Sequence, residues 1–413
     1  MSPVATDAVS SFKESFGVET TSLKAKLPLP ASDHSTLPAQ WMRDESIFEL
    51  EKRAIFSKVW LLTSHTSHFS KPGDYISGNN VFDYFIIRDK DDNYQAFHNV
   101  CRHRAYPVVS KSEGSSLVIG CKYHGWSYNA KGDLVKAPKF DTVPGFDKKA
   151  NGLFKIHTHV TTQGFIFLNF DASPNPVPFE DHFAQLPAEW KDTDFTQYEP
   201  YYYRQVVGNF NWKTMSDGYQ ECYHCTIAHP GFSQSLDLTG YTVEPLSNSA
   251  RHTVPLKSNP EEKQSFVFIF PTHGVTVAPE VWYILRSVPL SATKTRMEFD
   301  VFRRKGVPEE VLLENRKFYT QVQQEDFDLC ENAQRGLNAG IYHKGVLHPE
   351  EEKGVLYYQS RVLDFCQTHL QLERQLGKVI YPARPLSQDD GEAPSCEASR
   401  LCAELDANGT MSW

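Results

Sequence analysis

Two short stretches of this 413-residue chain concentrate cysteine and histidine, side chains that commonly ligate transition metals. The first is "CRHRAYPVVSKSEGSSLVIGCKYHGW", in which Cys101 is paired with His103 and Cys121 with His124. The second is "ECYHCTIAHP", residues 221–230, which holds two cysteines, two histidines and an acid. Both patterns predict metal chemistry, but of different kinds.

Each pair in the first stretch combines one cysteine with one histidine. Structural zinc more often takes Cys-x2–4-Cys and His-x3–5-His pairs, so zinc is the weaker interpretation. Mixed pairs suit a [2Fe–2S] cluster of the Rieske type, with Cys101 and Cys121 on one iron and His103 and His124 on the other. Neutral imidazoles in place of thiolates remove negative charge and raise the reduction potential of such a cluster.

The second stretch allows three interpretations. Cys222, Cys225 and His229 could hold zinc, or the two cysteines could form a redox dithiol. Alternatively, His224 and His229 could join a distant carboxylate in the facial triad of a non-haem Fe(II) oxygenase. The two histidines are five residues apart, about 500° around a regular helix, so the helix must loosen or end between them. Pro230 is placed to stop it.

The surrounding elements divide the chain into a β-rich part and a mixed part. Residues 44–59 have an apolar stripe typical of a helix that Asp44 or Ser46 can cap, and short β-branched or aromatic runs separated by turns follow up to about residue 170. Residues 209–230 have helical character, residues 265–304 predict strands, and residues 308–337 predict a long helix. The polar ends, 1–38 and 385–413, predict an arm and a mobile tail.

Bulk properties exclude several classes of protein. The formal net charge of −9 argues against nucleic-acid binding. No run of about 18 apolar residues predicts a membrane span, and the first twenty residues fit neither a secretory signal nor a transit peptide, so we expect a cytoplasmic protein. Eight cysteines are too few for a disulfide scaffold in a chain of this length.

With these motifs in place, roughly residues 40–375 resemble the catalytic α subunits of the Rieske non-haem iron oxygenases, the ring-hydroxylating oxygenase family. The resemblance rests on the two Cys-His pairs, on "NWK" at 211–213, on E-C-Y-H-x4-H-P and on "QEDFDLCENAQRGL". It implies that His224, His229 and Asp326 bind a mononuclear Fe(II). By that match Cys222 and Cys225 become packing residues, and Glu325 and Asp328 solvated helix charges.

The same resemblance implies a fold class and domain boundaries. We expect an α+β protein with an N-terminal all-β Rieske [2Fe–2S] domain and a C-terminal catalytic domain of antiparallel sheet and helices, of the helix-grip type. The expected boundaries are an N-terminal arm at 1–40, the Rieske domain at 41–170, the mononuclear iron domain at 171–380 and a flexible tail at 381–413.

Glu221 lies one helical turn before His224, and the resemblance gives it a role between the two centres. In the family an acid here, usually Asp, bridges an iron-ligand histidine and a Rieske histidine of the neighbouring subunit. Glu221 would therefore connect His224 with His124 of another copy, in a C3 homotrimer. The chain has no dinucleotide or flavin motif, so we expect electrons from NAD(P)H to arrive through a separate reductase or ferredoxin.

The expected reaction is O2-dependent hydroxylation of a C–H bond in a small substrate. The single α chain and the Glu bridge most resemble the choline, glycine betaine and carnitine oxygenases, which act beside a quaternary nitrogen. Aromatic faces would hold such a cation, and the candidates are Trp282, Tyr283, Phe268, Phe270 and Tyr219. The alternatives are hydroxylation of an arene or natural product by the same centre, and a Rieske electron carrier whose second metal site is structural.

Overall fold

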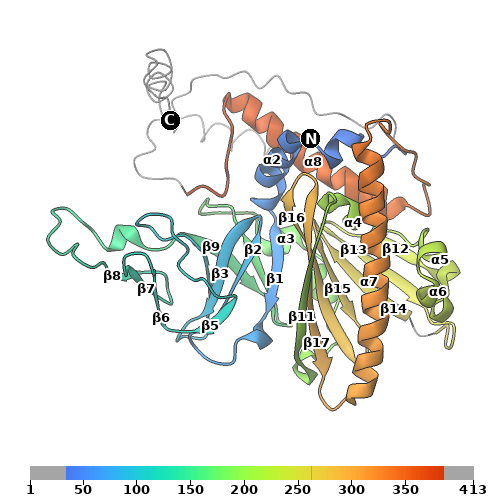
Figure 1. The fold of residues 1–413 in the computed structure, drawn as a ribbon, viewed down its shortest axis with the longest axis horizontal. Helices are drawn as coiled ribbons and strands as arrows, with labels where there is room; N and C mark the ends of the chain where they lie inside the picture. The colour runs from blue at the N-terminus through green and yellow to red at the C-terminus, as the bar shows by residue number, and fades with distance from the viewer. Residues whose placement is uncertain (1–33, 262, 386–413) are drawn as a thin grey trace.

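The computed structural model describes residues 34–261 and 263–385. Two lobes lie side by side, a β-rich lobe that contains the Cys-His pairs and a larger lobe built on one broad sheet (Figure 1). Cys396, Cys402 and most of the predicted arm and tail lie outside the described residues. No described helix is long and apolar enough to cross a membrane.

The β-rich lobe contains two antiparallel sheets. The larger has the strand order β1-β10-β9-β4-β3-β2-β5, and the smaller has the order β6-β7-β8. Their strands are β1 (Trp60–His65), β2 (Asp74–Asn80), β3 (Phe82–Arg88), β4 (Tyr94–His98), β5 (Glu113–Ser115), β6 (Val118–Gly120), β7 (Ser127–Asn129), β8 (Leu134–Lys136), β9 (Lys155–Val160) and β10 (Phe165–Asn169). The β-branched and aromatic runs of the sequence supply these strands, as expected.

The larger lobe is built on a seven-stranded antiparallel sheet in the order β11-β17-β16-β15-β14-β13-β12. Its strands are β11 (Tyr198–Gly208), β12 (Thr242–Pro245), β13 (Ser249–Pro255), β14 (Lys263–Ile269), β15 (His273–Val277), β16 (Val281–Ser291) and β17 (Lys294–Arg304). The arrangement confirms the expected α+β class, with an all-β lobe and an antiparallel sheet-and-helix lobe.

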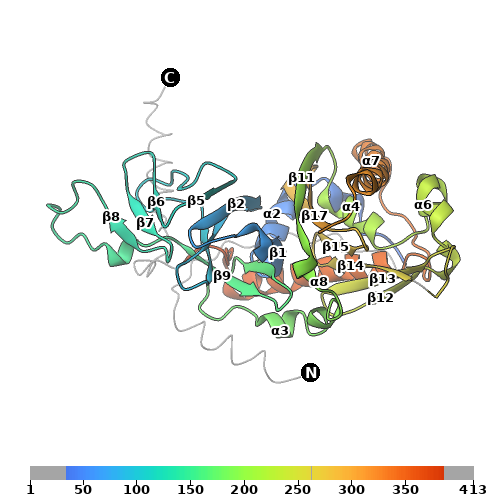
Figure 2. The same ribbon diagram turned by 90° about the horizontal axis from the view of Figure 1, so that it is seen from below.

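The long helices cover one face of the broad sheet, and strands of the other lobe, together with the short helix at 179–182, pack on its opposite face (Figure 2). The helices are α2 (Glu45–Glu51), which continues as a π-helical turn η2 (Lys52–Phe56), α3 (Phe179–His182), α4 (Trp212–Tyr219), α5 (Cys225–Ala228), α6 (Pro230–Ser235), α7 (Glu309–Asn338) and α8 (Lys353–Leu376). Short 3-10 turns are η1 (Ala39–Met42), η3 (Thr66–His68), η4 (Lys149–Asn151), η5 (Leu186–Ala188), η6 (Phe195–Gln197) and η7 (Leu238–Gly240).

Pro230 does not stop a helix, contrary to the expectation from sequence. The helical region expected at 209–230 is three separate pieces, and Pro230 is the first residue of α6. Proline suits this position because the first N–H of a helix has no partner within the helix. The expected break between His224 and His229 is confirmed, since α5 ends at Ala228 and His229 leaves the helical conformation with φ −121° and ψ 74°.

A buried ion pair joins the segment that precedes β1 to the larger lobe. Lys213 Nζ lies 2.6 Å from Glu51 Oε1, with both side chains fully buried, and Trp212 Nε1 donates to Glu51 Oε2 at 2.8 Å. Nearby, Arg53 binds Glu373 of α8 at 2.8 Å. Residues 45–53 therefore pack against the helices of the larger lobe, although the predicted boundary at residue 41 places them with the β-rich domain. The boundaries themselves stay a prediction.

Candidate functional site

The four residues of the first motif lie on two turns of the same shape. One follows β4, and the other joins β6 to β7. In both turns the N–H of the cysteine donates to the carbonyl of the residue five positions later, Cys101 to Tyr106 at 2.9 Å and Cys121 to Trp126 at 2.7 Å. The carbonyl of the same cysteine accepts from the N–H four positions later, from Ala105 at 3.0 Å and from Gly125 at 2.9 Å. Ala105 and Gly125 both have positive φ, 55° and 75°. The two turns therefore share the backbone that carries each cysteine, while the histidine follows two residues after Cys101 and three after Cys121.

The two turns face each other and bring the four side chains together. The His103 and His124 ring centroids are 4.6 Å apart, and His103 stacks on Trp126 at 4.9 Å. Cys101 and Cys121 are buried, free thiols. Nδ1 of His103 is buried without a hydrogen-bond partner among the described residues. A buried, unpaired ring nitrogen beside two thiols is the donor set that a [2Fe–2S] cluster requires.

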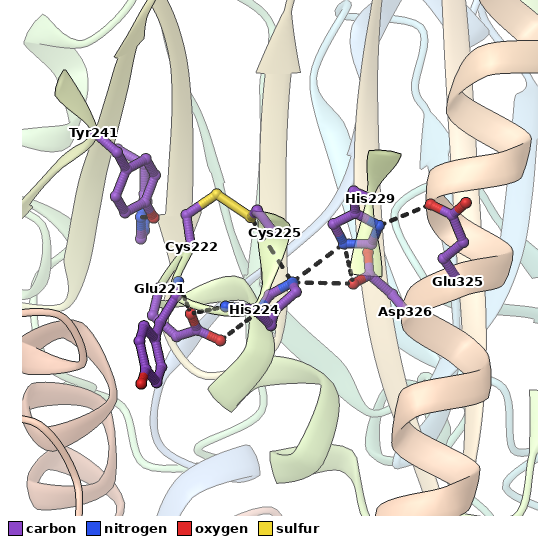
Figure 3. Close-up of a disulfide and its surroundings, with 10 residues drawn as sticks. Glu221, Cys222, His224, Cys225, His229, Tyr241, Glu325 and Asp326 are labelled. Carbon is purple, nitrogen blue, oxygen red and sulfur yellow. Dashed lines mark hydrogen bonds and ion pairs between the residues drawn. A yellow bond between two sulfur atoms is a disulfide. The ribbon is translucent and has the colours of Figure 1, made fainter. Parts of the chain in front are cut away.

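The second centre forms where the helical region breaks and α7 passes. His224 precedes α5, His229 precedes α6, and Asp326 comes from the middle of α7, so three elements contribute one side chain each (Figure 3). His229 Nε2 lies 3.2 Å from His224 Nε2 and 3.0 Å from Asp326 Oδ1. Asp326 Oδ1 lies 3.6 Å from His224 Nε2. Three donor atoms thus converge on one point.

A carboxylate holds the outer ring nitrogen of each of these histidines. Glu221 Oε1 bonds His224 Nδ1, and Glu325 Oε2 lies 2.8 Å from His229 Nδ1. When Nδ1–H donates to a carboxylate, Nε2 keeps its lone pair and points inward. Two lone pairs 3.2 Å apart repel each other unless a cation lies between them. The residues present therefore fit a metal ion ligated by His224, His229 and Asp326.

Glu325 corrects the expectation from sequence. We expected a solvated helix charge, but its side chain is only 25% exposed and binds His229. Asp328, three residues further along α7, is exposed as expected and accepts from Gln324 at 2.9 Å. Adjacent acids on a helix point about 100° apart, and the sequence alone does not show which of them faces a histidine ninety-six residues away.

The hydrogen bonds at this centre shift the pKa values of His224 and Asp326 toward their charged forms. Burial opposes protonation of His224, but hydrogen bonds to Asp326 and Glu221 outweigh it and raise the pKa of His224 to about 10. Burial likewise opposes ionisation of Asp326, yet its bonds to His224 and His229 lower the pKa of the Asp326 carboxyl. A proton and a metal ion compete for the same cluster of atoms.

Cys222 and Cys225 are joined as a disulfide with a Cα–Cα distance of 4.9 Å (Figure 3). We expected residues that pack or support the site, and the structure adds a covalent bond between them. The bond also removes the zinc interpretation in this form of the protein, because disulfide sulfurs are not thiolate ligands. Cys225 Sγ lies 3.9 Å from His224 Nε2, so the disulfide forms part of the wall beside the candidate metal site.

A cavity of about 130 Å³ opens from the candidate metal site between α4, α7 and the broad sheet. Aromatic rings form most of its wall: Tyr219, Phe232, Tyr241, Phe266, Tyr283, Phe299 and Tyr319. Gly218 of α4 also lines it, and a Cβ at this position would have no neighbour within 4 Å.

Three of the five aromatic candidates are not in the cavity wall. Neighbours on a strand face opposite sides of a sheet, so Tyr283 faces the cavity while Trp282 faces the other lobe and stacks on Phe302 at 3.8 Å. Phe268 lies beneath Tyr219, and Phe270 stacks on Phe365 of α8 at 5.3 Å. Tyr219 and Tyr283 do line the wall. The other five rings come from separate elements, and no local pattern marks them.

Two family models match the two lobes. The Rieske [2Fe-2S] domain matches residues 59–147, and the catalytic domain of the ring-hydroxylating alpha subunits matches residues 194–368. The chain belongs to the Rieske-type oxygenase α subunits, whose cofactors are a [2Fe–2S] cluster and a mononuclear iron, and it is an oxidoreductase of that class.

Particular relatives extend the match along most of the chain. The carnitine monooxygenase oxygenase subunit of Acinetobacter baumannii is 29% identical over 366 residues, covering 80% of this chain and 95% of the relative. The chloroplastic choline monooxygenase of Beta vulgaris is 27% identical, covering 80% and 77%. The crystal structure of the quaternary ammonium Rieske monooxygenase CntA with an inhibitor matches with a TM-score of 0.76 at 27% identity, covering 85% and 100%. Naphthalene 1,2-dioxygenase, at 19% identity and a TM-score of 0.67, shares the fold.

Proposed function

We propose that this oxygenase hydroxylates a methyl or methylene carbon next to the nitrogen of a small quaternary or tertiary amine. The observation that carries the proposal is the aromatic cavity beside the metal site. Its seven rings can surround an ammonium group, and the carboxyl side chains in the described wall are those of Glu221 and Asp326. No lysine or arginine lines the cavity among the described residues. Relatives named for carnitine and choline support the same class of substrate.

In this proposal His224, His229 and Asp326 hold the mononuclear iron, and Cys101, His103, Cys121 and His124 hold the cluster. The mononuclear iron supplies O2 activation, with electrons that the cluster delivers. The protein's own contribution is to fix both imidazole rings through Glu221 and Glu325, and to leave the cavity side of the iron site open. The aromatic wall excludes water and places the substrate carbon next to the site.

The proposed electron path runs between subunits. His124 is exposed at the tip of the β-rich lobe, so a second copy can reach its ring. Glu221 has a side chain only 10% exposed, and Tyr223 and Ile227, which are 64% and 85% exposed, lie beside it. These features support a homotrimer in which Glu221 connects His224 to the partner's cluster. A separate NAD(P)H-dependent reductase or ferredoxin supplies the electrons, and a cytoplasmic location stays a prediction.

Product analysis tests the substrate class. The iron-loaded protein, a compatible reductase, NADH and O2 are incubated with choline, L-carnitine, γ-butyrobetaine, and with benzene and naphthalene as arenes. We expect NADH-dependent conversion of at least one quaternary ammonium compound and no product from the arenes. Conversion of the arenes alone would contradict the proposal and favour the alternative of arene hydroxylation.

A further inference from the structure

One row of side chains across four strands forms the floor of the cavity. The register pairs His252 of β13 with Phe266, Phe266 with Thr276 of β15, and Thr276 with Tyr283 of β16. Directly paired residues in a sheet point to the same face, so all four face the cavity together. The row is therefore aromatic at two positions and polar at His252 and Thr276.

Three polar atoms at this floor have no hydrogen bond of normal geometry within the described protein. They are the hydroxyl groups of Tyr219 and Thr276 and Nε2 of His252, and all three are buried. The Tyr219 and His252 rings are in contact, with centroids 5.6 Å apart. Buried polar groups are nearly always paired. His252 Nε2 has no partner among the described residues, and the Tyr219 and Thr276 hydroxyls are close enough to interact only with each other and with nearby side chains, so this wall keeps hydrogen-bonding capacity for a bound group.

The local structure fixes these groups in place. Tyr219 lies over Gly274, where a Cβ would be 2.7 Å from the tyrosine hydroxyl, so only glycine allows this position of the ring. His252 Nδ1 lies 2.7 Å from the Tyr241 hydroxyl. Burial lowers the pKa of His252 to about 3, so its ring is neutral and Nε2 can serve a neutral partner. These three groups offer hydrogen bonds but no positive charge, so they suit a neutral hydrogen-bonding group better than an anion.

A positive side chain lies behind the cavity wall but is not among the lining residues. Arg204 of β11 lies one layer behind the wall, with its guanidinium 5.6 Å from the Phe299 ring centroid and Nη1 donating to Gln323 Oε1 at 3.0 Å. Its guanidinium group contacts Phe299 and Gln323, which line the cavity, and does not line the cavity itself. Among the described residues no lysine or arginine lines the cavity, so a carboxylate bound away from the iron would have no protein counter-ion, and burying an unpaired charge is unfavourable.

We propose that Tyr219, His252 and Thr276 bind a hydroxyl group of the substrate, so that the cavity selects a quaternary ammonium alcohol over an ammonium carboxylate. The inference rests on the proposed function and refines its substrate class. It places this chain with a choline-like substrate, although the carnitine-named relatives are as similar in sequence as the choline-named ones.

Calorimetric titration of the iron-loaded protein, without reductase or turnover, tests this selection. The ligands are choline, L-carnitine, γ-butyrobetaine, ethyltrimethylammonium, which lacks the hydroxyl, and 3,3-dimethyl-1-butanol, which lacks the charge. We expect choline to bind at least tenfold more tightly than either carboxylate and about fivefold more tightly than ethyltrimethylammonium. The neutral alcohol should bind more weakly than choline.

Two shape-conserving variants locate the effect. Tyr219→Phe and Thr276→Val each remove one hydroxyl, and each should weaken choline binding about three- to tenfold while leaving ethyltrimethylammonium binding unchanged. Thr253→Val is the matched control, because Thr253 lies on the same strand as His252 but faces the other side and binds Thr242. It should change neither ligand.

The outcomes separate this inference from the function on which it rests. Equal or tighter binding of L-carnitine or γ-butyrobetaine overturns the inference and leaves the proposed function intact. So does choline binding in the wild type that is no tighter than ethyltrimethylammonium binding, or choline binding that neither variant weakens. If no quaternary ammonium compound binds a protein that holds its iron, or the neutral alcohol binds as tightly as choline, the proposed substrate class fails and this inference fails with it.

Discussion

The two candidate metal centres of this chain are built in opposite ways. The four residues of the cluster site come from two turns within 24 consecutive residues of one lobe, and each turn presents its ligands by the same local hydrogen bonds. The iron site needs a broken helix and a residue of α7, about a hundred positions later. The comparison teaches that a local motif can define an electron-transfer site, whereas the site that meets substrate depends on the packing of the whole lobe.

The largest expected effect separates the two centres completely. Cys121→Ser should remove the cluster and its visible absorption, lowering the iron content by two per chain. The mononuclear iron should remain, because its ligands lie in the other lobe. Iron and acid-labile sulfide analysis measures both. Cys366→Ser, at a buried free cysteine of α8, is the matched control and should keep the cluster; joint loss of both centres in Cys121→Ser would show that they are not independent.

The next effect tests how strongly the larger lobe depends on distant packing. Lys213→Ala leaves Glu51 buried without its partner, and the free energy of unfolding in urea should fall by about 3–5 kcal/mol. Lys131→Ala is the control, because Lys131 and Asp91 are also 2.6 Å apart but both are exposed. That variant should be indistinguishable from wild type. Similar stability of the two variants would mean that the buried pair does not hold residues 45–53 to the larger lobe.

A smaller effect concerns the carboxylate behind His229. Glu325→Gln keeps the size of the side chain but weakens its hold on Nδ1 of the ring, so iron affinity and turnover should fall roughly 10–100-fold. Asp328→Asn removes a charge from the same helix at an exposed position and should have little effect. Competition with a chelator measures the iron affinity of both variants. If both variants lower the iron affinity to the same extent, Glu325 acts only through its charge and not through its contact with His229.

The smallest effect is a pH dependence of stability. Burial raises the pKa of Asp217 from 3.8 to about 8, so between these values the folded protein holds a proton that the unfolded chain has released. The free energy of unfolding therefore falls as pH rises from about 4 to about 8, by about 1.4 kcal/mol per pH unit. Asp217→Asn keeps the bond to Gln359 and should lose this slope. Urea unfolding at pH 5.5, 6.5 and 7.5 measures the slope. If the free energy of unfolding of wild type and variant changes equally with pH, a group other than Asp217 causes the pH dependence.

The sequence predicted much of the fold and little of the cavity. Local periodicity and turn residues were enough for most strands and for α7, and the spacing of His224 and His229 required the helix break that the structure has. The role of Pro230 was misjudged because proline both ends and begins helices. Glu325, the Cys222–Cys225 bond and the ring of Phe299 depend on contacts between distant segments, which spacing along the chain does not encode.

We propose above all that His224, His229 and Asp326 form a catalytic iron site separate from the cluster. Iron content and product formation of His229→Ala, measured on the same preparation as wild type, test it most directly. We predict three irons per wild-type chain and two in the variant, with an unchanged visible cluster spectrum and no product. A variant that keeps three irons, or that still forms product, would contradict the claim, and two irons in the wild type would favour an electron carrier.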